Sequence, residues 1–67
     1  MDFKYIFKNE SIKLIIEEDL VSFYLIVYNN PNSNKSDEDY LADSLHEAFT
    51  EAEEKFGVLR EQWKIIN

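Results

Sequence analysis

The hydrophobic pattern of this chain changes its period once. Before Asn29, apolar and polar residues alternate, whereas beyond Ser36 apolar residues recur at every third or fourth position. Alternation is typical of a β-strand with one buried face, and the longer period is typical of an amphipathic helix. The pattern therefore predicts a sheet in the first half of the chain and one helix in the second half.

Three runs in the first half have the features of strands. Aromatic residues occupy alternate positions in residues 3–8, starting at Phe3, and aliphatic residues do so in residues 12–17. The third run, residues 20–28, is rich in β-branched and aromatic residues, which favour strands. Because only short polar connectors separate the runs, they are expected to pair as an antiparallel meander.

The third run is unusual because both of its faces are apolar. One face carries Val21, Phe23, Leu25 and Val27, and the other carries Leu20, Tyr24, Ile26 and Tyr28. Such a strand is usually covered on both sides, but one helix can cover only one face of a small sheet. The second face is expected to be screened by the C-terminal segment, by tyrosine rings lying flat on it, or by a second copy of the chain in a homodimer.

Two serines could cap the helix that follows the polar loop 29–35. Ser36 precedes three acids, which the helix dipole favours in a first turn, whereas Ser44 forms a capping box with Glu47. We favour Ser44, because residues 39–42 can then form a short edge strand. A helix that starts at Ser44 thereby avoids a bare loop of about fifteen residues, which would be uncommon in so small a domain.

The helix is expected to end at Gly57, the only glycine, in the left-handed conformation that glycine favours. The apolar tail beyond it should fold back over the sheet, with Trp63 as a lid on the core. This predicts one α+β domain over residues 1–67, in which a meander of three or four antiparallel strands carries one helix on one face (βββα-like). Its expected core residues are Phe7, Leu14, Ile16, Phe23, Leu25, Leu45, Phe49, Ala52 and Phe56. The apolar stripe assigned to the helix also includes Leu41.

The composition narrows the expected partners. The chain has 67 residues and no cysteine, and its 14 acidic and 7 basic residues give a formal net charge of -7. That charge repels nucleic-acid phosphate and anionic membranes and favours a basic protein partner. With no apolar run near the ~18 residues of a spanning helix and no signal-peptide core, a cytoplasmic location is expected.

Candidate catalytic or metal-binding residues are few. His46 lies one turn from Asp43, where a carboxylate could orient it as a base or help it to bind a metal, but a lone histidine is more often a solvated side chain. Residues 37–39, all acidic, could bind a divalent cation, yet they lack the glycine and the terminal glutamate of a calcium loop. A solvated acidic entry to the helix explains them better. We therefore expect no catalytic residue, no cofactor and no metal, and we do not expect an enzyme.

The polar side of the predicted helix is the best candidate for a binding surface. Its acidic positions are Asp43, Glu47, Glu51 and Glu54. Such a surface can serve solubility alone, or it can attract a basic protein. We expect it to be the contact surface if the chain has a protein partner.

Residues Asp43 to Ala48, with Ala52 and Phe56-Gly57, resemble the D-S/T-L-x-E-A helix of HicB-type antitoxins and of other small bacterial proteins in which a sheet precedes one helix. The resemblance covers about fifteen residues and implies a βββα-like fold and neutralisation of a toxin. Together with the charge, it predicts a small acidic interaction protein of the antitoxin, immunity or inhibitor type. The alternative is a structural or regulatory subunit that assembles with its own copies.

Overall fold

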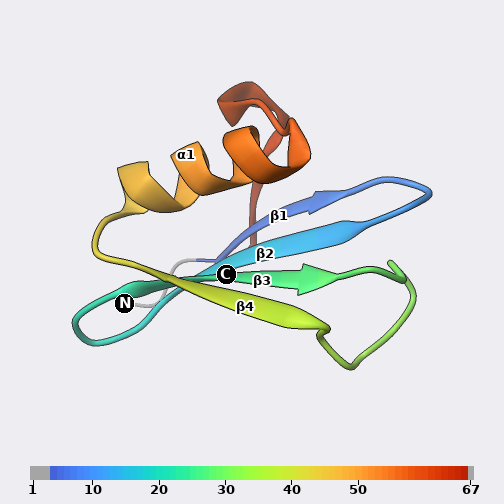
Figure 1. Ribbon diagram of the computed structural model, residues 1–67, viewed down its shortest axis with the longest axis horizontal. Coiled ribbons are helices and arrows are strands. Elements are labelled where there is room, and N and C mark those ends of the chain that lie inside the picture. The colour runs from blue at the N-terminus through green and yellow to red at the C-terminus, as the bar shows by residue number, and fades with distance from the viewer. Residues whose placement is uncertain (1–3, 67) are drawn as a thin grey trace.

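The computed structural model describes residues 4–66, so the predicted strand position Phe3 lies outside the described residues. The strands are β1 (Lys4–Lys8), β2 (Lys13–Glu18), β3 (Phe23–Tyr28), β4 (Glu38–Ala42) and β5 (Lys64–Ile66). The helices are α1 (Leu45–Phe56) and the short 3-10 helix η1 (Arg60–Gln62). The strands form one sheet in the order β4-β3-β2-β1-β5, and α1 lies across one face of it (Figure 1). The α+β prediction is confirmed, with one strand more than expected.

Short polar turns create the meander. The Asn9 side chain accepts hydrogen bonds from the backbone N–H groups of Ser11 and Ile12, both at 2.8 Å, and so closes the β1–β2 turn. The β2–β3 turn is closed by the N–H of Asp19, which donates to the Ser22 carbonyl at 2.8 Å. Each connection is short enough to impose antiparallel pairing.

The predicted start of the third strand at residue 20 was wrong. Strand β2 extends through Glu17 and Glu18, which pair with Tyr24 and Phe23. The turn therefore falls on the next residues, and Leu20 and Val21 are 98% and 89% exposed at its tip. Apolar character made them look like strand residues, but the pairing register decides where a hairpin turns.

The loop between β3 and β4 was predicted correctly, but the acids that follow it were misplaced. Asp37 accepts a hydrogen bond from the Asn29 backbone N–H at 2.8 Å and donates its own N–H to the Val27 carbonyl at 2.8 Å. Glu38 and Asp39 then begin the edge strand β4. Residues 37–39 thus form the entry to a strand, and the interpretation as a solvated helix entry was wrong.

The helix begins and ends as predicted. Ser44 has extended backbone angles, and its hydroxyl accepts a hydrogen bond from the N–H of Glu47 at 3.1 Å. Gly57 ends α1 with φ 70°, in the left-handed region, and donates its N–H to the Glu53 carbonyl at 2.9 Å. Because the helix starts after Ser44, Leu41 belongs to β4 and is 62% exposed, so its assignment to the helical stripe was wrong.

The core lies between α1 and the facing side of β2 and β3. Leu14, Ile16, Leu25 and Val27 are fully buried there, together with Ala48 and Ala52 of the helix. The remaining predicted core residues are partly buried and pack against this cluster: Phe7, Phe23, Leu45, Phe49 and Phe56. The face of β3 that was chosen for the core is therefore the correct one.

The C-terminal segment packs on the same side of the sheet as α1. Val58 is buried, and the Trp63 ring lies with its centroid 5.7 Å from that of Phe49 and 6.4 Å from that of Phe7. The predicted lid at Trp63 is confirmed. Beyond it, β5 pairs with β1 and widens the sheet. The C-terminal segment therefore does not screen the second face, and that alternative was wrong.

Candidate functional site

A shallow groove of about 320 Å³ runs between α1 and the edge strand β4. Leu41 and Ala42 line it from the strand, and His46, Glu47, Thr50, Glu51 and Glu54 line it from the helix. The helical residues Glu47, Glu51 and Glu54 are spaced by four and three, which puts them on one side of the helix. Three of the four predicted partner-binding residues thus come together, while the exposed Asp43 lies just before the helix and outside the lining.

At the start of α1, Glu47 has a structural role as well as a charge. Its carboxylate accepts a hydrogen bond from the Asp43 N–H at 2.9 Å, while its own N–H donates to the Ser44 hydroxyl. These reciprocal bonds satisfy one backbone donor in the first turn of the helix and one just before it. A charge reversal at Glu47 would therefore destabilise the start of the helix as well as remove a negative charge from the groove, although the side chain is exposed.

At the other end of the groove, Lys55 connects the helix to the sheet. Its ammonium lies 3.8 Å from a carboxylate oxygen of Glu51 and 4.9 Å from the centroid of the Tyr40 ring on β4. An ion pair this long between partly exposed groups contributes at most about 0.5 kcal/mol. Glu51 therefore keeps most of its capacity to attract another cation.

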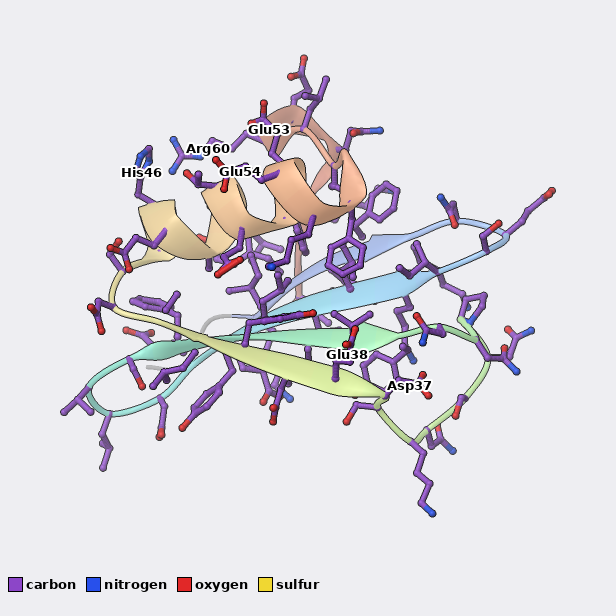
Figure 2. The ribbon with its side chains drawn as sticks, in the orientation of Figure 1. Asp37, Glu38, His46, Glu53, Glu54 and Arg60 are labelled. Atoms are coloured by element: carbon purple, nitrogen blue, oxygen red, sulfur yellow. The ribbon has the colours of Figure 1, made fainter. Side chains whose placement is uncertain are left out.

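His46 is exposed at the rim of the groove, as expected for a solvated side chain. Its Nδ1 atom lies 3.4 Å from Nη2 of Arg60, and the Arg60 guanidinium in turn lies 4.8 Å from the centroid of the Phe49 ring. Figure 2 shows His46 and Arg60 side by side above the helix. The ring nitrogen therefore faces a cation, and not the carboxylate of Asp43 that could have oriented it as a base.

Residues 37–39 do not form a cation site with other acids. Asp37 is used in the loop, and Glu38 and Asp39 are successive strand residues, whose side chains point to opposite faces. Figure 2 shows Asp37 and Glu38 on the sheet, well separated from His46 at the start of α1. Within residues 4–66, no group of three or more His, Cys, Asp and Glu side chains is arranged to hold a metal ion.

Three residues of the groove, Leu41, Ala42 and Thr50, were missed by the sequence analysis. Thr50 lies between Glu47 and Glu51 on the same side of α1, so its position follows directly from the helical spacing. Leu41 was assigned to the helical stripe. If residues 39–42 are treated as a strand throughout, the alternation places the Leu41 side chain on one face of the strand and the inward-pointing Tyr40 and Ala42 on the other.

No protein-family model, curated protein sequence or solved structure matches the chain. The resemblance to HicB-type antitoxins therefore stays a prediction. In the structure, the motif residues Ser44 and Glu47 cap the helix, and Leu45 and Ala48 pack into the core. Within the part of the chain that the structure describes, no helix is both long and apolar enough to cross a bilayer.

Proposed function

We propose that this chain is a small acidic, non-enzymatic protein-interaction module that binds a basic protein partner at the groove between α1 and β4. The observation that carries the proposal is the convergence of Glu47, Glu51 and Glu54 on one groove beside an edge strand. An antitoxin, an immunity protein or an inhibitor is the type of molecule that this chemistry fits.

The distribution of charge supports a partner on the helix side. The opposite face of the sheet carries Lys4, Lys8, Lys13 and Lys64, which are four of the seven basic residues. The acids of α1 are therefore only partly offset by nearby bases, chiefly Lys55 and Arg60. Because basic residues gather on one face of the sheet and acidic residues on α1, a basic partner is attracted to the helix side of the molecule.

The polar groups of the groove favour recognition over catalysis. The Thr50 hydroxyl donates to the His46 carbonyl at 2.9 Å, so it does not donate to a general base. The His46 ring lies beside a guanidinium, which stays protonated at neutral pH and cannot accept a proton. The carboxylates can bind a Lys or Arg side chain without any further group.

The test is charge reversal at the two acids that do not cap the helix, Glu51→Lys with Glu54→Lys. A basic partner retained from the native host by the immobilised parent protein would be purified, and its association rate would be measured at several ionic strengths. We expect the double variant to associate about tenfold more slowly at low salt and with a flatter salt dependence, because steering by opposite charge is lost.

The matched control is Glu10→Lys with Asp19→Lys, which changes the net charge equally but at two hairpin turns. It should slow association far less than the groove variant. If the two pairs of substitutions slow association equally, the total charge explains the effect, and the groove is not the contact surface. If the groove variant associates as fast as the parent, the proposal that the groove is the contact surface is also refuted.

The alternative function, a structural or regulatory subunit that assembles with its own copies, is favoured by a different feature. The sheet face opposite α1 is partly apolar and has no covering element among the described residues (Figure 1). That feature does not involve the groove.

A further inference from the structure

The sheet face that points away from α1, here called the open face, has an ordered pattern of side chains. On β2 and β3, Leu14, Ile16, Leu25 and Val27 point to the helix, so the residues between them point to the open face. The middle row of this face follows from the pairing register and reads Asp39, Ile26, Ile15, Ile6, Lys64 across the sheet. It begins with an acid at one edge and ends with a base at the other.

The isoleucines of this row are not part of the core. Ile6, Ile15 and Ile26 are only half-buried and do not belong to the apolar cluster beneath the helix or to the residues packed against it. A row of three aliphatic side chains across the centre of a sheet face is larger than the scattered exposed apolar residues of an ordinary surface. It marks a face that gains free energy when covered.

The row is self-complementary under a two-fold rotation. Consider a two-fold axis that runs parallel to β2 and passes over Ile15. It stacks each row of the open face on the same row of a second copy, with the order of the strands reversed. Ile15 then meets Ile15 of the other copy, Ile6 meets Ile26, and Asp39 meets Lys64 at both ends. A face that contacts itself must be complementary to its own image in this way.

The same axis also determines the contacts of the neighbouring rows. On one side, Lys4 meets Tyr24 of the second copy. On the axis, Glu17 meets its own copy, and each Glu17 already has the Lys4 ammonium of its own chain at 3.0 Å. On the other side, Lys8 meets Tyr28, and Lys13 meets its own copy while its ammonium is held 3.2 Å from the Ser33 carbonyl.

We propose that the open face is the interface of a two-fold symmetric homodimer, in which two sheets pack with their strands aligned. Aligned packing is one of the two common arrangements of stacked sheets. The molecule measures 30 × 22 Å along its two longer axes. One face of a molecule of this size is no larger than the about 800 Å² per partner of a standard interface. We expect a dissociation constant in the micromolar range.

A nucleic acid fits the open face less well. The Lys13 ammonium lies 4.2 Å from the centroid of the Tyr28 ring, so that ring face is already occupied and not open to a stacking base. The net charge of -7 also opposes a polyanion. The homodimer goes beyond the proposed function because it uses the opposite face and needs no other protein.

The first experiment measures the molecular mass by sedimentation equilibrium from micromolar to millimolar concentration, without any partner. The parent should show a monomer–dimer equilibrium. Ile15→Lys should be monomeric throughout, because it places two ammonium groups at the axis in place of an apolar contact. Val21→Lys, at the exposed turn, is the matched control and should dimerise like the parent.

The second experiment tests the axis itself. Asp39→Lys places two ammonium groups together at each edge of the interface, and Lys64→Asp places two carboxylates together there. Each variant alone should therefore dimerise at least about tenfold more weakly than the parent. When the two variants are mixed, one subunit of a heterodimer carries a base at positions 39 and 64 and the other carries an acid at both. Each edge contact of the heterodimer therefore pairs an ammonium group with a carboxylate, as in the parent. The mixture should therefore form heterodimers with close to the parental dissociation constant.

Each result supports or overturns the interface. A monomeric parent at millimolar concentration, or a dimer that Ile15→Lys leaves intact, overturns it. Mixed charge variants that do not recover association overturn the two-fold arrangement, since that arrangement pairs residue 39 with residue 64 at both edges. Circular dichroism of every variant separates loss of association from loss of folding.

Discussion

At the scale of single residues, Phe49 holds together parts of the chain that are far apart in sequence. Its ring lies 5.3 Å from that of Tyr5 on β1 and 5.7 Å from that of Trp63, both in edge-to-face geometry, and the Arg60 guanidinium covers it at 4.8 Å. Such aromatic pairs contribute about 0.5–1.5 kcal/mol beyond the buried area. One side chain on α1 therefore links the helix to the first strand and to the C-terminal segment.

Phe49→Ala should lower the free energy of unfolding by about 3 kcal/mol, through the lost burial and the cavity left between β1 and Trp63. In a domain of this size that is a large share of the total stability, so the melting temperature should fall clearly. Denaturation by urea or heat measures the change. Leu20→Ala, at a side chain that is 98% exposed, is the control and should change little. An unchanged melting temperature of Phe49→Ala would contradict the packing of α1 on the sheet.

Residue burial was predictable where a regular period fixes the face of an element. Leu14 and Ile16 alternate with polar or outward residues, and Ala52 belongs to the helical stripe, so each could be assigned to the core from local spacing. Leu20 and Val21 could not, because they are apolar residues in a turn whose position depends on the pairing of Glu17 and Glu18 with β3. Hydrophobicity alone does not separate a strand end from a turn.

At the scale of elements, the helix boundaries were predictable because caps are local. The bonds that fix the start of α1 join residues four positions apart or fewer, Asp43 to Glu47 and Glu47 to Ser44. Strand β5 was not predictable in the same way. Its partner is β1, with Lys4 opposite Ile66, and no local signal reports a contact between the two ends of a chain.

Ser44→Ala should destabilise the protein by about 1 kcal/mol, because the N–H of Glu47 loses its acceptor. Ser44→Asp should retain most of the stability, since a carboxylate can accept the same bond. Ser36→Ala is the matched control, because Ser36 is the other candidate cap and lies eight residues earlier in the exposed loop. Chemical denaturation of the three variants measures the difference. Equal losses at Ser36 and Ser44 would contradict the assigned start of α1.

At the scale of the whole molecule, the fold separates charges that are mixed along the chain. The sequence predicts the net charge and the acidic side of the helix, but lysines 4, 8, 13 and 64 come from three different strands and meet only in the sheet. The candidate groove was therefore partly predictable, since three of its acids follow helical spacing, whereas the row Asp39–Ile26–Ile15–Ile6–Lys64 depends on four pairings. The sequence analysis recognised the β3 part of this surface, whereas long-range register determined which residues of the other strands join it.

Under both proposals, the homodimer and the partner-binding groove use opposite sides of each subunit, which leads to a prediction about stoichiometry. The groove lies beside α1, and the open face lies on the other side of the sheet (Figure 1). A dimer formed through the open face thus presents two grooves on its outer surfaces. Isothermal titration with the purified basic partner should give two equivalent sites per dimer.

The Ile15→Lys monomer should bind one partner molecule with a dissociation constant within about twofold of the parental value per site, because Ile15 points away from α1 and does not line the groove. Light scattering on the saturated parent should show a complex of two subunits and two partner molecules. If saturation with the partner instead yields a complex of one subunit and one partner molecule while the free parent is a dimer, the partner competes for the open face. In that case the acids of α1 are not the contact surface.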